Sequence, residues 1–171
     1  MPNLYPSHLT AVQAHVMRAL YLNPFALNSE IGAMTHTHHD SVARVIPIML
    51  DDETPVNNRL RLFYQLGYIY NLQSILSHDN TPRRFQNILE LWAQKPYYNN
   101  REIADAVYMS ESVIGNYTSQ IYKWFGYTPR NSKKYYTARL EFYEYMGIFD
   151  TQRLAVDAVA QYKEVFNAIK L

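Results

Sequence analysis

Residues 99–126, NNREIADAVYMSESVIGNYTSQIYKWFG, decide the fold of this chain. Their first part places apolar side chains at the i, i+1, i+4, i+5 spacing of a short helix with one buried face, namely Ile103, Ala104, Val107 and Tyr108. Met109 is expected to end this helix. Ser110 is then expected to cap a second helix, because its hydroxyl can accept a hydrogen bond from an orphan backbone N–H. The stretch therefore predicts two helices joined by a tight turn.

Polar and apolar positions fall on opposite faces of the second helix, predicted over 111–124. Helical spacing predicts an inward stripe that consists of Ile114, Tyr117, Thr118, Ile121 and Phe125. It leaves outward Ser112, Gly115, Asn116, Ser119 and Lys123. This outward face is polar, small and nearly free of negative charge, which suits a helix that enters a DNA major groove.

These residues resemble the helix-turn-helix domain of the LuxR/NarL/FixJ regulators. The shared pattern is supplied here by Asn100, Glu102, Ile103, Ala104, Val107, Met109, Ser110, Glu111, Ile114, Asn116, Ser119 and Ile121. Upstream, the T-P-R at 81–83 and the segment 88–93 resemble the opening and first helix of the family, and 146–148 resembles its closing L-G-L/I. The match covers residues 80–149 and implies an all-α, DNA-binding domain.

The resemblance also implies which side chains contact DNA. Carried over position by position, base or phosphate contacts fall on Ser112, Val113, Gly115, Asn116, Ser119 and Lys123. Asn116 is suited to bidentate reading of adenine, and Lys123 is suited to a phosphate. The family usually has Lys at the positions of Ser112 and Gly115, so two basic anchors are absent here. A protein-binding module would use the same helix for packing alone.

A basic cluster follows this helix. Arg130, Lys133 and Lys134 form the densest group of positive charge in the chain, at the expected start of the next helix. We expect these three side chains to contact phosphates beside the recognition helix. The alternative is an ordinary solvated helix start.

The first half of the chain repeats the second half. Shifted by 72 positions, residues 9–49 align with 81–121 without a gap; beyond them the shift becomes 80, so eight residues are inserted before the last helix. The repeat predicts tandem helix-turn-helix domains, a first copy over 8–70 and a second over 80–149, joined by a linker over 71–79. The expected helices are 10–22, 28–35, 39–49 and 56–66 in the first copy and 82–94, 100–107, 111–124 and 132–146 in the second.

The first copy is the more degenerate one. Asp40 stands at a usually basic position, and Pro47 falls well inside the expected recognition helix, where an interior proline costs about 3 kcal/mol. A helix that ended or kinked near Ile46, instead of continuing over the expected 39–49, would present a different surface. Arg44, at the position equivalent to Asn116, is its one basic contact. The first copy is expected to serve as a partner of the second, a dimer surface or a weak second DNA contact.

Residues 150–171 are predicted to form a C-terminal amphipathic helix. Its apolar stripe consists of Leu154, Ala155, Ala158, Val159, Tyr162, Val165, Phe166 and Ile169. A stripe this broad has to be buried. Two alternatives remain open: packing on the chain's own core, or a homodimer seam.

The run from Thr35 to Asp40 contains three histidines and suggests a zinc site. Neighbours this close rarely converge on one tetrahedral ion, so no metal site is expected. We expect instead a turn between two helices, with His38 in the place of the capping Ser; a third alternative is that the imidazoles contact DNA and gain charge below about pH 6.5. The chain contains no phosphate-binding loop, nucleophile elbow or H-E-x-x-H motif, so neither an enzyme nor a cofactor is expected.

Composition and charge set the remaining bounds. The 171 residues are 48% apolar, contain no Cys and no apolar run of membrane-spanning length, and open without a signal-peptide pattern, which predicts a cytoplasmic protein with no membrane association. Residues 8–72 carry four Arg against five acids, a net charge of −1, whereas residues 80–149 carry nine Lys and Arg against six acids, a net charge of +3. Positive charge therefore accompanies the better-matched copy.

Together these observations predict an all-helical, sequence-specific regulator of transcription that binds double-stranded DNA. No receiver or ligand-sensing segment is recognisable, a bareness that fits a compact regulator such as one on a phage or plasmid. The alternative is an interaction protein that keeps the fold and binds another protein, for instance polymerase, a regulator or a defence complex.

Overall fold

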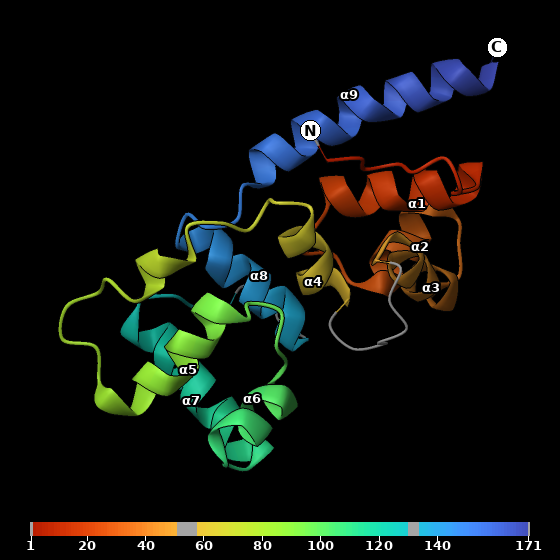
Figure 1. Ribbon diagram of the computed structural model, residues 1–171. Coiled ribbons are helices and arrows are strands. Elements are labelled where there is room, and N and C mark those ends of the chain that lie inside the picture. The colour runs from red at the N-terminus through yellow and green to blue at the C-terminus, as the bar shows by residue number, and fades with distance from the viewer. Residues whose placement is uncertain (1, 51–57, 130–133, 171) are drawn as a thin grey trace. The chain divides into compact units, whose positions relative to one another are not determined.

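The computed structural model describes residues 2–50, 58–129 and 134–170, and its regular structure is helical (Figure 1). Among these residues, one isolated bridge between Ile69 and Phe149 is the only β pairing. The predicted all-α class is confirmed. The chain divides into two compact units: a first unit of Met1–Tyr68 with Asp150–Leu171, and a second unit of Ile69–Phe149.

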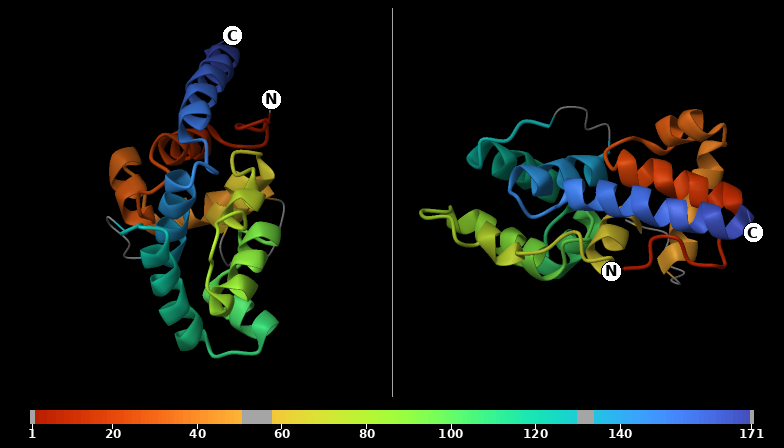
Figure 2. Two further views of the ribbon diagram at one scale, coloured as in Figure 1. Left: turned by 90° about the vertical axis from the view of Figure 1, so that its left-hand side faces the viewer. Right: turned by 90° about the horizontal axis from the view of Figure 1, so that it is seen from above.

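The first unit contains α1 (Ala11–Leu22), α2 (Asn28–Thr35), α3 (His39–Leu50), α4 (Asn58–Gln65) and α9 (Thr151–Lys170). The helix α9 lies alongside α1, as Figures 1 and 2 both show. Leu154 and Ala158 of α9 are fully buried, and the Ala158 carbonyl accepts a hydrogen bond of 2.8 Å from the Tyr5 hydroxyl. The segment before α1 is thus bonded to both helices, because the Tyr21 hydroxyl of α1 also donates to the Leu4 carbonyl over 2.8 Å.

The tail helix accordingly packs on its own unit, which is one of the two alternatives drawn from the sequence. Tyr68 adds a polar contact, because its hydroxyl donates to the Asp157 carboxylate over 2.7 Å. The side chains of Phe166 and Ile169, at the far end of the predicted stripe, lie outside the described residues. No helix among the described residues is long and apolar enough to span a membrane.

The second unit contains the 3-10 helix η1 (Leu72–Ile75) and the helices α5 (Arg83–Gln94), α6 (Asn100–Val107), α7 (Glu111–Trp124) and α8 (Tyr135–Tyr145). Its core is aromatic, with Trp92, Tyr122 and Phe142 packed at ring-centroid distances of 5.1–6.0 Å. The segment 71–79, expected as a linker, holds η1, which packs on α5 and belongs to this unit.

Equivalent residues of the two copies make equivalent contacts. Arg59 on α4 is buried and donates to the Pro24 and Ala26 carbonyls and to Asn28 Oδ1. Its counterpart on α8, Arg139, is likewise buried and donates to the Tyr98 carbonyl and to Asn100 Oδ1. Each guanidinium ties the last helix of its copy to the residues that open the second helix. We call these two arrangements the arginine clamps.

The turns repeat as well. His36 and Tyr108, which follow α2 and α6, both adopt the left-handed conformation, with φ of 54° and 58°. Each turn is closed by one backbone bond of the same kind, from the Thr37 N–H to the Gly32 carbonyl in the first copy and from Met109 to Ala104 in the second.

The structure corrects one expectation and decides one alternative. Tyr108, predicted on the buried face of its helix, is 95% exposed, because α6 ends at Val107 and the left-handed cap turns the next side chain outward. The helix α3 continues through Pro47 to Leu50, one residue beyond the expected 39–49, so the alternative of an end near Ile46 does not occur. The carbonyl that loses its partner there belongs to Ala43, which is exposed to water, while Val42 and its buried neighbours hold the helix in place.

Candidate nucleic-acid interface

The helix α7 is fixed in place by its cap and its buried face. The Ser110 hydroxyl accepts a hydrogen bond of 3.3 Å from the Val113 N–H, as the sequence predicted. Ile114, Thr118 and Ile121 are buried, and the Thr118 hydroxyl returns to the Ile114 carbonyl over 2.9 Å, so this polar side chain is satisfied within its own helix. The helix packs mainly on α6.

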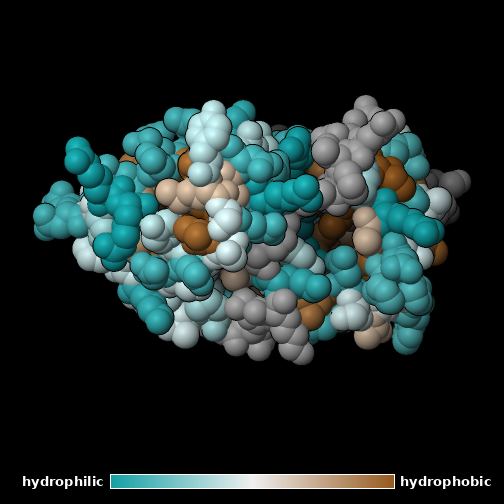
Figure 3. Space-filling model, turned by 90° about the horizontal axis from the view of Figure 1, so that it is seen from below, coloured by the Kyte–Doolittle hydropathy of each residue, from teal (hydrophilic) through white to brown (hydrophobic). Residues whose placement is uncertain are grey.

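The predicted contact residues of α7 lie on its free side. Ser112, Val113, Asn116, Ser119 and Lys123 are all exposed, and Gly115 is half-buried. At about 100° of rotation per residue, Asn116 lies on the opposite side of the helix from the buried Ile114, Ile121 and Phe125. We call this exposed side of α7 the outer stripe. The left-hand part of Figure 3, where the region of α6 and α7 is seen from below, is mostly hydrophilic, with small groups of hydrophobic residues.

Two hydroxyls of the outer stripe are already engaged. Ser112 shares a hydrogen bond of 3.3 Å with Ser110, and Ser119 donates over 3.3 Å to the carbonyl of Gly115. The Asn116 amide, by contrast, makes no hydrogen bond with any described residue. Its donor and acceptor are therefore both available to an incoming ligand.

Gly115 leaves open space on the flank of α7. A Cβ atom built there would come no closer than 4.0 Å to another side chain, the amide nitrogen of Asn100. Space at the Cβ position therefore does not require a glycine at residue 115.

The loop between α5 and α6, residues 95–99, is held in place by a contact from α8. Tyr143 is fully buried and its hydroxyl donates to the Pro96 carbonyl over 2.8 Å. Burial raises the pKa of Tyr143 well above its ordinary value, with Arg139 acting weakly in the other direction. The phenol therefore remains a donor at all physiological pH values, and it secures the loop beside the arginine clamp.

Only part of the predicted basic cluster lies in the described region. Lys134 is exposed and directly precedes α8, where its carbonyl accepts a hydrogen bond of 2.9 Å from Thr137. Arg130 and Lys133 lie outside the described residues.

The equivalent helix of the first copy presents different chemistry. Arg44 and Asp40 are exposed on α3, and Ile48 is 37% exposed near its end. His38 takes the place of the capping Ser, as predicted, since its Nδ1 accepts from the Asp40 N–H over 3.3 Å.

The histidine run brings three possible metal donors together. Asp40 lies 3.5 Å from His38 Nδ1 and 3.2 Å from His39 Nε2, and the donor atoms of the three residues fall within 4.8 Å of one another. All three side chains are more than half exposed, and the His38 nitrogen already accepts the capping hydrogen bond. The contact between His38 and Asp40 is therefore accounted for by the cap of α3.

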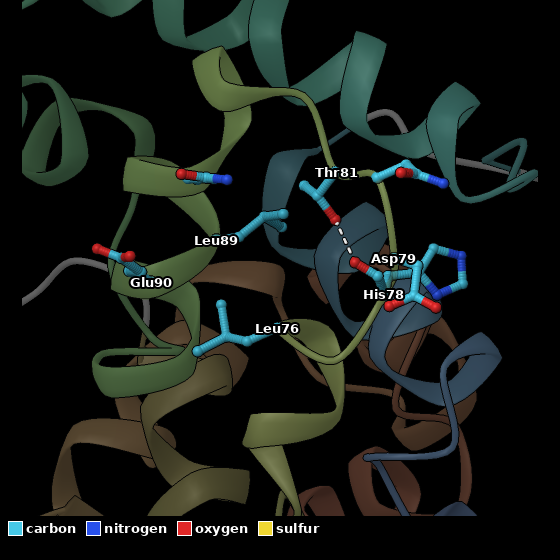
Figure 4. A pocket seen from close by; sticks show the side chains of 8 residues that line it. Leu76, His78, Asp79, Thr81, Leu89 and Glu90 are labelled. Atoms are coloured by element: carbon cyan, nitrogen blue, oxygen red, sulfur yellow. Dashed lines mark hydrogen bonds between the residues drawn. The ribbon is translucent and has the colours of Figure 1, made fainter.

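A hollow of about 490 Å³ opens elsewhere in the second unit, beside α5 (Figure 4). Leu89 and Glu90 line it from the helix, while Asp79 and Thr81 line it from the preceding loop, where the Thr81 hydroxyl donates to the His78 carbonyl. Its lining contains none of the predicted site residues.

Three exposed residues on or beside α7 were not predicted as site residues from the sequence. Tyr108 and Met109 occupy the α6–α7 turn, with exposed fractions of 95% and 41%, and Gln120 lies on α7 one turn beyond Asn116. The i, i+4 relation of Gln120 to Asn116 was a usable signal, because such residues share one face of a helix. Comparisons with family models, with curated proteins and with solved structures find no match to this chain.

Proposed function

We propose that the protein is a sequence-specific transcription regulator that binds double-stranded DNA and reads the major groove mainly through α7. The observation that carries this proposal is the outer stripe: a capped helix whose exposed side is polar and centred on the Asn116 amide, which no described residue engages. An asparagine in this setting is suited to bidentate pairing with the N6 and N7 atoms of adenine.

Charge supports the assignment of this role to the second unit. Residues 69–149 carry nine Lys and Arg against seven acids, a net charge of +2, whereas the remainder of the chain carries seven against eight, a net charge of −1. Phosphate contacts by cationic side chains supply most of the affinity of such proteins for DNA. The second unit is therefore the better electrostatic match to a duplex.

A protein-interaction module is the second candidate, and the α6–α7 turn favours it. Tyr108 and Met109 expose apolar surface there, and exposed aromatic and methionine side chains are common at protein interfaces. In this alternative the outer stripe contacts another protein and salt has little systematic effect on binding.

The test is a titration of the protein with duplex DNA at several salt concentrations, repeated with Arg130, Lys133 and Lys134 all changed to Ala. Each phosphate contact contributes roughly 0.9 to the slope of log affinity against log salt. We expect the triple variant to bind all duplexes more weakly and to flatten this slope by up to about 2–3 units, with the preferred sequence unchanged.

Two results would point elsewhere. A triple variant with the wild-type slope shows that the cluster is a solvated helix start. A wild-type protein that binds no duplex at low salt rejects the DNA proposal and leaves the protein-interaction module as the function to test.

A further inference from the structure

The outer stripe carries a second free amide. Gln120 is exposed, lies four residues after Asn116 on the same side of α7, and makes no hydrogen bond with any described residue. Each of the two amides offers one donor and one acceptor side by side. In the major groove, adenine presents the complementary pair of an N7 acceptor and an N6 donor, and glutamine and asparagine both read it bidentately.

The spacing of the two amides suits nearby base pairs. Four residues of α-helix advance about 6 Å along the axis. Successive base pairs are separated by about 3.4 Å. Asn116 and Gln120 therefore match adenines one or two base pairs apart when α7 lies along the groove.

Val113 adds an apolar contact at the N-terminal end of the same side. It lies three residues before Asn116 and is 37% exposed. An aliphatic side chain in the major groove packs on the thymine C5-methyl group, which cytosine lacks.

Among the other exposed residues of α7, Lys123 is the one cation able to favour a G·C pair, and the resemblance assigns it to a phosphate. The helix contains no Arg, and its one Lys, Lys123, lies in the last turn, about 10 Å along the axis from Asn116. Glu111, which is able to accept from cytosine, lies in the first turn on the far flank of the helix from Asn116. Ser112 and Ser119 are engaged locally and discriminate little.

From these observations we infer that α7 reads a core of A·T base pairs, in which Asn116 and Gln120 each pair with an adenine and Val113 packs on a thymine methyl group. Gln120 is thereby a specificity-determining residue. The inference rests on the proposed function, since it describes what the outer stripe selects once it lies in a groove.

The experiment selects preferred sequences from a random duplex library with the full-length protein, then measures affinity for the selected duplex. Base analogues probe the two contacts: 7-deazaadenine lacks N7, and uracil lacks the thymine methyl group. We expect an A·T core, and a loss of about 5- to 150-fold when a contacted adenine is replaced. Uracil should weaken binding of the wild-type protein at one or more thymines of the core.

Single variants then assign each contact. Gln120→Ala should lose its preference for one adenine and bind 7-deazaadenine there as well as adenine, while Asn116→Ala does so at another position. Val113→Ala should lose the discrimination of thymine from uracil. Gln94→Ala, an exposed glutamine at the end of α5, is the matched control and should bind as the wild type does.

The outcomes separate the inference from the function beneath it. Selection of a G·C core, or a Gln120→Ala variant that keeps every adenine preference, overturns the inference while DNA binding stands. A library that shows no enrichment, from a protein that binds no duplex, overturns the proposed function and the inference with it.

Discussion

The helices α3 and α7 occupy the same place in the two copies and present opposite surfaces. Both begin after a left-handed residue and a capping side chain, His38 in one and Ser110 in the other. On α7 the outer stripe is a row of small polar residues and two free amides. On α3 the corresponding positions include an acid, an arginine and an interior proline, Asp40, Arg44 and Pro47.

This difference shows which residues hold the fold and which are free to change. The arginine clamps and the left-handed turns agree between copies. So do the buried positions Ile31 and Ile103, Gly32 and Ala104, and Val42 and Ile114. The exposed side of the third helix does not. The first copy therefore shares the framework of the fold with the second but not the surface that makes α7 a candidate for reading DNA.

The largest expected effect comes from removing residues 150–171. The first unit would lose the fully buried Leu154 and Ala158 and would uncover Tyr5, so we expect it to unfold, whereas the second unit contains no residue of this segment. Trp92 and Trp124 are the only tryptophans of the chain and both belong to the second unit. Tryptophan fluorescence should therefore keep its unfolding transition while the helical circular dichroism signal falls.

A milder variant controls for the truncation. Leu154→Ala should lower the free energy of unfolding of the first unit by about 2–5 kcal/mol without altering the fluorescence transition. If the fluorescence transition shifts together with the circular dichroism signal in the truncated protein or in Leu154→Ala, the two units do not unfold independently.

The arginine clamps should matter equally in both copies. Arg59→Ala and Arg139→Ala each leave backbone carbonyls without their buried donor and remove a packed side chain, so we expect each to cost about 3 kcal/mol. Urea unfolding followed by fluorescence should report the loss for Arg139 and circular dichroism the loss for Arg59. Arg101→Ala, on the exposed face of α6, serves as the control and should change stability by less than about 0.5 kcal/mol.

Binding should distinguish the two third helices. Asn116→Ala should lower discrimination between preferred and unrelated duplexes by about 1–3 kcal/mol, and Arg44→Ala, at the equivalent position of the first copy, should lower it by less. Competition binding at fixed salt measures both. The roles of the copies are reversed if Arg44→Ala abolishes binding while Asn116→Ala leaves it intact.

The smallest effects concern two glycines with opposite surroundings. Gly115→Ala meets open space and gains helix propensity, so it should stabilise the second unit by up to about 1 kcal/mol. At Gly32 of α2 a Cβ atom would lie against the Thr37 carbonyl, and Gly32→Ala should therefore destabilise the first unit by about 1–3 kcal/mol. Thermal unfolding of the two variants should shift in opposite directions; a shift in the same direction contradicts this account.

Local signals predicted much of the fold. The bounds of α2, α6 and α7 agree with the sequence expectation to the residue, because capping residues and apolar periodicity both act within a few positions. The outward side of α7 was predicted for the same reason. The internal repeat extended the predicted helices from residues 80–149 to residues 8–70.

The remainder depended on contacts between distant parts of the sequence or on competing local effects. The sequence of residues 150–171 does not show that they pack against α1, because an apolar stripe predicts burial but not the surface against which it is buried. Tyr108 fits a helical period, yet the left-handed cap turns it outward. Pro47 favours a helix end, yet α3 continues through it while Val42, Val45 and Ile46 are buried.

The nested order of the two units has a consequence for synthesis on the ribosome. The second unit is one continuous segment, Ile69–Phe149, whereas the first needs α9, which is translated after all of the second. Domains generally fold as units while the chain emerges, at about 5–20 residues per second. The second unit is therefore able to fold first. The amino-terminal helices are translated earlier, but α1 reaches its contacts with α9 only after residues 150–171 have been translated. The candidate DNA-reading helix α7 is thus able to form in the nascent chain before the amino-terminal segment contacts α9.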